Sequence, residues 1–161
     1  TAPIYVALVK SLGASPQAIP WPELPTALQQ KVVDGQENGV TNIVNASMYQ
    51  TQKYFTADGH VFSWHAYMMN ASFFNKLSDS EKTAVLDGIE LAKIIHRGMT
   101  ATQDANAKTI LTEKGMEVYN PTPVELAEFR KLAQPAGREW VVNEIGAEWV
   151  EKLEKAIKTV Q

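Results

Sequence analysis

Apolar residues recur at helical spacing over the longest uninterrupted stretch of the chain. Between residues 79 and 113 apolar positions return every three or four residues and no proline intervenes. Ser78 and Glu81 stand where a capping box would open such a helix. The pattern predicts one helix over 79–113, about 50 Å long at 1.5 Å per residue, with at most one bend near Gly88 or Gly98.

Shorter patterns predict the remaining elements, and prolines and glycines separate them. In chain order these are a helix over 4–12, a helix in "PELPTALQQK", a strand ending at "VVDG", helix-like spacing from Val40 to Tyr49, a strand over 59–70, a short strand after Gly115, a helix capped by Thr122 and Glu125, and helices over 134–144 and 146–159. The strand over 59–70 is longer than usual, and a strand of that length can run between two lobes.

Composition narrows the classes of protein. The 161 residues are 45% hydrophobic and carry a formal net charge of −3, with scattered basic residues. This balance argues against nucleic acid, because binding to phosphates needs concentrated Lys and Arg. Cysteine is absent, which excludes structural disulfides and thiol nucleophiles, and fits the bacterial periplasm as well as the cytoplasm. The first residues are not a signal peptide and lack an initiator Met, so we expect a chain cut from something longer.

The stretch "VVDGQENGVTNI" (32–43) concentrates polar residues beside two glycines. An EF-hand calcium loop would need a bidentate Glu at its twelfth position, where this chain has Asn45. An enzyme could pair Asp34 with Glu37 as acid and base, but no nucleophile or metal motif stands nearby. A plain turn explains Asp34 and Gly35, but not the length of the polar run. At the junction between a strand and a helix, polar side chains often face a ligand cleft. A ligand-binding edge is therefore the fourth interpretation of this stretch.

The histidines do not predict a metal site. His60 and His65 are five residues apart on a predicted strand, so they would lie on opposite faces. His96 falls in the predicted long helix, where a surface or half-buried position is expected. The sequence contains no metalloprotease, nucleophile-elbow, P-loop or dinucleotide-binding motif.

Two longer stretches resemble a known family. "SLGASPQAIPWPELPTALQQKVVDGQENGVTNI" and "QKYF…GHVFSWHAYMMN…FFNKLSDSEK" are similar to the solute-binding proteins of tripartite ATP-independent periplasmic (TRAP) transporters, of the dicarboxylate-binding type. The resemblance covers at least residues 10–100. One departure is Gly39, where many members have Pro after "QEN".

The resemblance implies an α/β fold, the C-terminal part of a two-lobed periplasmic-binding-protein fold with a long lobe-spanning helix. Residues 1–64 would form a second-lobe segment with the ligand-facing edge. Residues 65–103 would form the connecting strand and a helix returning to the first lobe. Residues 104–161 would form the end of the long helix and the C-terminal helices of the second lobe.

The resemblance also implies function and partners. The protein would be a periplasmic, non-enzymatic receptor that binds a small carboxylate and delivers it to membrane permease subunits, with no cofactor and no metal. An N-terminal half of the receptor would precede residue 1 and would carry the arginine that grips the ligand carboxylate.

Two positions match ligand-binding residues of the family, and two more residues are second-tier candidates. The cleft aromatic falls on Trp21, and the Asn of "QEN" falls on Asn38, whose amide can donate to a carboxylate oxygen. Glu37 and His60 would line the cleft near the distal end of the ligand. Packing roles remain the alternative for Trp21, Glu37 and His60.

Two other classes of protein stay open. One is a small acid-processing enzyme using Asp34 and Glu37, which turnover of the ligand would reveal. The other is a helical interaction module built around the long helix, in which Trp21 and Asn38 would not share a cleft.

Overall fold

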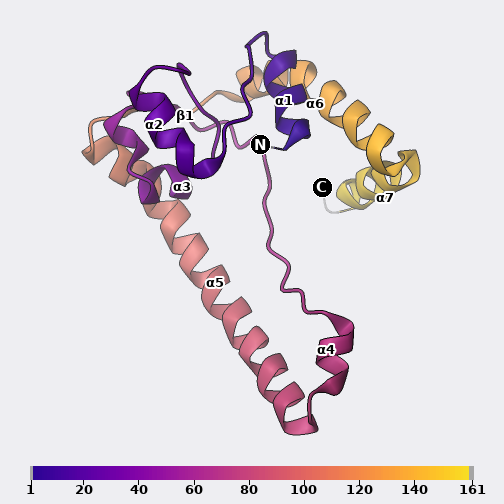
Figure 1. Cartoon of the computed structure of the whole chain (residues 1–161). Coiled ribbons are helices and arrows are strands. Elements are labelled where there is room, and N and C mark those ends of the chain that lie inside the picture. The colour runs from indigo at the N-terminus through magenta and orange to yellow at the C-terminus, as the bar shows by residue number, and fades with distance from the viewer. Residues whose placement is uncertain (1, 160–161) are drawn as a thin grey trace. The chain divides into compact units, whose positions relative to one another are not determined.

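The computed structural model describes residues 2–159, which form two compact units (Figure 1). The first unit comprises Thr1–Gln36 and Tyr119–Gln161, and the second comprises Glu37–Val118. The predicted segments 1–64 and 104–161 include positions 1, 160 and 161, which lie outside the described residues. The elements are α1 (Pro3–Ser11), η1 (Trp21–Glu23), α2 (Leu24–Gln29), α3 (Val40–Asn45), η2 (Met48–Gln50), β1 (Tyr54–Thr56), α4 (Ala71–Lys76), α5 (Asp79–Glu113), β2 (Glu117–Tyr119), α6 (Pro123–Ile145) and α7 (Ala147–Lys158).

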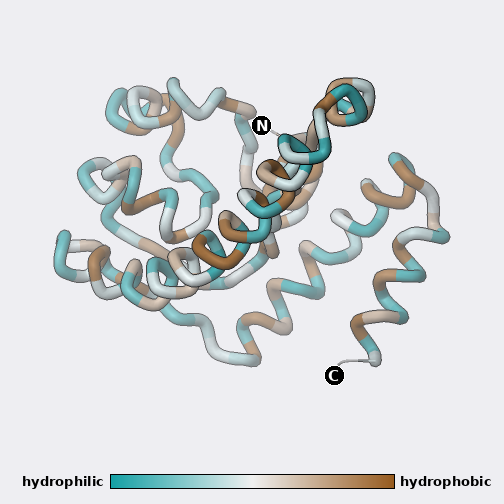
Figure 2. The backbone as a smooth tube through the Cα atoms, turned by 90° about the horizontal axis from the view of Figure 1, so that it is seen from below, coloured by the Kyte–Doolittle hydropathy of each residue, from teal (hydrophilic) through white to brown (hydrophobic). Residues whose placement is uncertain are grey.

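In the first unit, α6 packs against both α1 and α7. Thr122 caps α6 through a capping box with Glu125, as predicted. The helix ends at Ile145 and is followed by Gly146, whose φ of 87° is a backbone conformation that glycine adopts without steric cost. In Figure 2, α7 is the helix that runs to the C-terminus, and hydrophobic and hydrophilic positions alternate along it. One apolar position of α7, Val150, is buried.

The prediction of a separate helix over 134–144 is wrong, because α6 runs without interruption from Pro123 to Ile145. Pro135 lies inside the helix. A proline removes one backbone hydrogen bond and crowds one carbonyl, at a cost of about 3 kcal/mol. The capping box at Thr122 and the packing against α1 and α7 stabilise α6 against this cost.

The core of the second unit forms where α3 packs against the C-terminal part of α5. Its buried side chains are apolar: Ile43, Met48, Ala107, Leu111 and Met116. The Thr41 hydroxyl donates a 2.6 Å hydrogen bond to the Asp104 carboxylate and ties α3 to α5. Strands β1 and β2 pair as a two-stranded sheet, and the backbone N–H of Glu117 donates to the Lys53 carbonyl oxygen at 2.8 Å. The short strand predicted after Gly115 is therefore confirmed as β2.

The predicted long helix is confirmed as α5, with the expected bounds Asp79–Glu113. Its capping box is also present. The Ser78 hydroxyl accepts from the Glu81 backbone N–H at 3.4 Å, and the Glu81 carboxylate accepts from the Ser78 backbone N–H at 2.8 Å. Among residues 2–159, no helix is both long enough and apolar enough to cross a membrane.

Two predicted strands are wrong. Residues 57–70 form no strand or helix, and Figure 1 shows them as an uncoiled trace leading into α4. The β1–β2 pair is the only sheet that the described part of the chain forms, so this segment has no ladder to join. Residues 32–34 form a bend, because the chain reverses immediately after α2. We call residues 57–70 the extended segment below.

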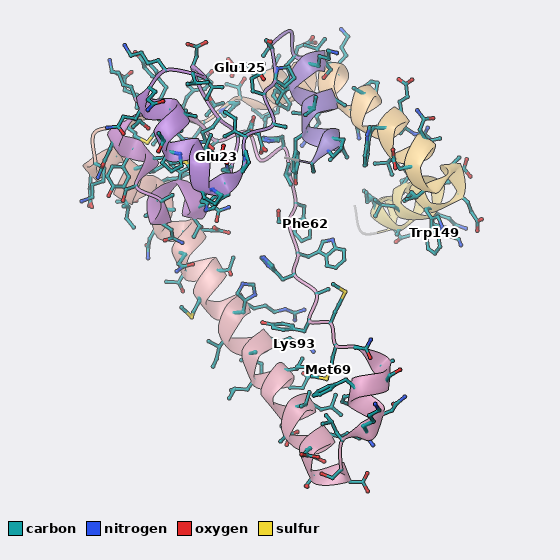
Figure 3. The ribbon with its side chains drawn as sticks, viewed as in Figure 1. Glu23, Phe62, Met69, Lys93, Glu125 and Trp149 are labelled. Carbon is teal, nitrogen blue, oxygen red and sulfur yellow. The ribbon has the colours of Figure 1, made fainter. Side chains whose placement is uncertain are left out.

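The extended segment exposes large apolar side chains. Phe62 is 90% exposed, and Figure 3 shows its ring projecting from the segment. Other large apolar residues of the segment are also exposed: Trp64, Tyr67, Met68 and Met69. Strand propensity explains why the sequence predicts a strand here, since β-branched and aromatic residues favour a pleated, half-buried surface.

Candidate functional site

The polar run that follows α2 has no regular secondary structure until α3 begins at Val40. Gln36, Glu37 and Asn38 are half-buried, whereas Asp34 is exposed. The boundary between the two units falls within this run, between Gln36 and Glu37. The polar side chains after Asp34 therefore belong to packed structure and not to a solvated turn.

His60 brings two carboxylates together in the second unit. Its Nδ1 lies 2.7 Å from Asp58 Oδ1, and its Nε2 lies 3.4 Å from Glu37 Oε2. The three side chains are partly withdrawn from water, with 16% of His60, 18% of Asp58 and 32% of Glu37 exposed. Each ring nitrogen therefore faces one carboxylate oxygen.

This geometry fixes the charge of the imidazole. The hydrogen bond to Glu37 is the largest effect and raises the pKa of His60, burial lowers it, and the hydrogen bond to Asp58 raises it again, to a value of about 9. The ring is consequently protonated at neutral pH and donates from both nitrogens. One positive charge then faces two negative charges, so the negative charge of Glu37 is compensated in part.

The sequence did not single out Asp58. Its Oδ1 also accepts from the backbone N–H of His60 at 3.4 Å, which is the pattern of an Asx turn. Gly59 between them has a φ of 60°, as such a tight turn allows. The string "ADGH" contains this turn signal, and it could have indicated that Asp58 and His60 lie close together.

The structure brings together some of the predicted site residues. Glu37 and His60 are in contact, and Asn38 is the chain neighbour of Glu37. Trp21 belongs to the first unit, where it opens η1 between Pro20 and Pro22 and is exposed. Flanking prolines restrict the backbone, so the Trp21 ring is presented from a stiff segment.

The side chains of this cluster offer hydrogen-bonding and charged groups. Among residues 2–159, no group of three or more His, Asp or Glu side chains is placed to hold a metal ion. The Glu37 carboxylate is occupied by His60, and Asp34 is exposed in the other unit. A carboxamide such as that of Asn38 can donate a hydrogen bond to an anionic oxygen.

Comparison with known proteins assigns the family. Residues 1–143 match the family model described as bacterial extracellular solute-binding protein, family 7. The chain is 32% identical over 138 residues to a solute-binding protein of Verminephrobacter eiseniae, covering 86% of this chain and 41% of that protein. The chain belongs to this family of solute-binding proteins.

Two solved structures show the same fold. A TRAP periplasmic solute-binding protein from Ochrobactrum anthropi, with its C-terminus bound in the ligand-binding pocket, superposes with a TM-score of 0.79 at 36% identity and covers 99% of this chain and 50% of that one. A TRAP periplasmic solute-binding protein from Polaromonas sp. JS666, bound to D-erythronate, superposes with a TM-score of 0.78 at 33% identity and covers 89% and 46%.

The chain spans about half the length of these relatives, and its helix-rich α/β structure is that of part of a TRAP periplasmic binding protein. The fold class predicted from the sequence is thus confirmed.

Proposed function

We propose that this chain is the part of a periplasmic receptor that supplies Asn38, Glu37, His60 and Trp21 to the binding of a small organic acid. The observation that carries the proposal is the half-buried Asn38, which follows Glu37 in the chain, together with the contact by which His60 partly compensates the charge of Glu37. An amide N–H there can donate to a ligand carboxylate, and the protonated His60 weakens the repulsion that Glu37 would exert on that ligand.

The relatives support this class of ligand. The Polaromonas protein is bound to D-erythronate, an organic acid, and the Ochrobactrum protein has its own C-terminus, which ends in a carboxylate, in its pocket. The receptor delivers its ligand to TRAP-type permease subunits in the membrane and acts without a cofactor. The remaining half of the receptor supplies an arginine and most of the first lobe, and residues 65–103 connect the lobes.

The test is Asn38→Ala in the full-length receptor. The substitution leaves a carboxylate oxygen without a donor, and hydrogen bonds to charged groups are worth about 1.5–3 kcal/mol, so the Kd should rise about 10- to 150-fold. Calorimetry against a panel of organic acids that includes D-erythronate measures the change.

Two controls accompany this titration. Asn45→Ala makes the same change at an exposed position of α3 and should leave affinity unchanged. Asp34→Ala should lower the melting temperature through the turn and leave the affinity of the folded protein intact. Wild-type affinity for Asn38→Ala, combined with lost affinity for Asp34→Ala, would place the ligand on the other side of the polar run.

A receptor and an acid-processing enzyme differ in what happens to the ligand. The full-length protein, incubated with an organic acid that it binds, should return the acid unchanged by NMR after a day. Conversion that Asp34→Ala and Glu37→Gln abolish would instead establish the enzyme.

A further inference from the structure

Asp58 is placed to control the orientation of the His60 ring. Its Oδ1 accepts a hydrogen bond from the His60 backbone N–H at 3.4 Å and lies 2.7 Å from Nδ1 of the same histidine. One carboxylate oxygen therefore contacts His60 at two points, on the backbone and on the ring. Because both side chains are also half-buried, these contacts restrict rotation of the imidazole to the orientation seen in the structure.

The far side of the ring carries this restriction to Glu37. With Nδ1 held by Asp58, the Nε2 atom of His60 faces Glu37 Oε2 at 3.4 Å. Glu37 directly precedes Asn38 in a run without regular secondary structure, so side-chain contacts have to orient this run in place of a helix or a strand. The position of the Glu37 carboxylate thus depends on Asp58 through the ring of His60.

We propose that Asp58 is a positioning residue of the organic-acid site, which holds His60 against Glu37 and thereby sets the pH range in which the receptor binds its anionic ligand. This inference rests on the proposed function for the ligand and adds to it a residue that does not itself touch the ligand. The contact between Asp58 and His60 is present without the ligand and can be tested without it.

The charges of the cluster connect Asp58 to affinity. The charged groups placed against the His60 ring are Glu37 and Asp58. The hydrogen bond to Glu37 contributes most to the raised pKa of His60, burial opposes it, and the hydrogen bond and charge of Asp58 raise it further, to about 9. Below that pH the imidazolium offsets one of the two negative charges.

Deprotonation of His60 removes this offset. Above pH 9 both carboxylates are unopposed by the ring, and a ligand carboxylate bound nearby is repelled more strongly. Affinity for an organic acid should therefore fall as the pH rises through about 9. Because Asp58 contributes to the proton affinity of the ring, loss of its charge should move this fall to a lower pH.

A purely structural role for Asp58 gives a different expectation. An Asx turn needs only a side-chain oxygen that accepts from the backbone N–H two residues later, and Asn provides this oxygen as well as Asp does. Asp58→Asn can therefore keep the turn while it removes the charge. If the turn were the whole role of Asp58, this variant would titrate and bind as wild type does.

The first measurement is an NMR titration of the imidazole nitrogens of the 161-residue protein between pH 6 and pH 10, with His60→Gln to assign the signal. In wild type, His60 should be protonated on both nitrogens at pH 7 and lose a proton near pH 9. In Asp58→Asn the midpoint should fall by about one pH unit or more. Asp87→Asn makes the same change at an exposed position of α5 and should leave the midpoint unchanged.

The second measurement is calorimetry of the full-length receptor over the same pH range, with D-erythronate or the acid of the panel that binds more tightly. Wild-type affinity should fall about 5- to 10-fold as the pH rises through the His60 midpoint, which is the effect of one unit charge close to the ligand. In Asp58→Asn the fall should follow the lower midpoint, and Asp87→Asn should match wild type. Circular dichroism should show the helix content of wild type in both variants.

Equal NMR midpoints for wild type and Asp58→Asn would overturn the proposal, whatever the receptor binds. Different midpoints with coincident affinity profiles would also overturn it, because Asp58 would then act on His60 without acting on the ligand. If wild type binds no acid of the panel, the proposed function fails and the role of Asp58 in binding fails with it. The NMR titration needs no ligand, so different midpoints in that case would locate the failure in the proposed function and not in the contact between Asp58 and His60.

Discussion

Helix α5 and the extended segment belong to the same unit and are separated in the chain by α4, yet they differ in how their backbone hydrogen bonds are made. Each interior N–H of α5 bonds to a carbonyl four residues earlier, so 35 consecutive residues form a regular element from local sequence alone. Residues 57–70 have strong strand propensity, but a strand takes its hydrogen bonds from another part of the chain. Regular structure in a helix is thus a local property, whereas in a strand it depends on a partner.

Proline substitution should separate the two regions most strongly. Ala101→Pro, at an exposed position inside α5, removes a helical hydrogen bond and should cost about 3 kcal/mol or more. Ala66→Pro, at an exposed position of the extended segment, should change stability by less than about 0.5 kcal/mol in this chain. Urea unfolding followed by circular dichroism measures both, and equal losses would show that the segment is paired in solution.

The extended segment is anchored at its start by side chains, which predicts a dependence on pH. The pKa of His60 is raised from 6.5 to about 9 in the folded protein, so its contribution is complete below pH 6.5 and disappears as the pH rises through 9. At 1.36 kcal/mol per pKa unit, the upper limit of this contribution is about 3 to 4 kcal/mol.

Stability of the 161-residue chain, measured by urea unfolding between pH 6 and pH 10, should therefore fall across this window. His60→Gln, which carries no titrating charge, should remove the fall. A flat profile for wild type would mean that the imidazole is not held between Asp58 and Glu37 in solution.

Removal of the cap should give the smallest effect. Ser78→Ala deletes the hydroxyl that accepts from the Glu81 backbone N–H and should cost about 1 kcal/mol. Ser63→Ala makes the same change in the exposed part of the extended segment and should be neutral. Hydrogen exchange should show faster exchange in the first turn of α5 for Ser78→Ala only, and comparable effects of the two variants would contradict local capping.

The same distinction explains which parts of the fold the sequence could predict. The bounds of α5 follow from Ser78, Glu81 and the spacing of its apolar residues, all of which are local signals. The prediction of a strand over 59–70 was wrong, because the residues of a segment do not indicate whether a partner strand is present. Pro135 predicted a helix boundary, but the packing of α6 against α1 and α7 overrides that local preference.

The candidate site was predicted in part for a similar reason. Resemblance to the family singled out Glu37 and His60, and their 3.4 Å contact places them together. Asp58 was overlooked because its role depends on a turn that folds its carboxylate back onto His60. The roles of Trp21 and Asn38 in ligand binding stay predictions, since they depend on a ligand.

The length of α5 has a mechanical consequence. The helix is fixed near one end, where Thr41 bonds to Asp104 and where Ala107 and Leu111 are buried. From Asp104 back to Asp79 the helix extends about 38 Å at 1.5 Å per residue, so a tilt of about 5° at the fixed end displaces the other end by about 3 Å. A rotation of α5 too small to disturb the packing around Leu111 would thus become a displacement comparable to the width of a water molecule at Asp79.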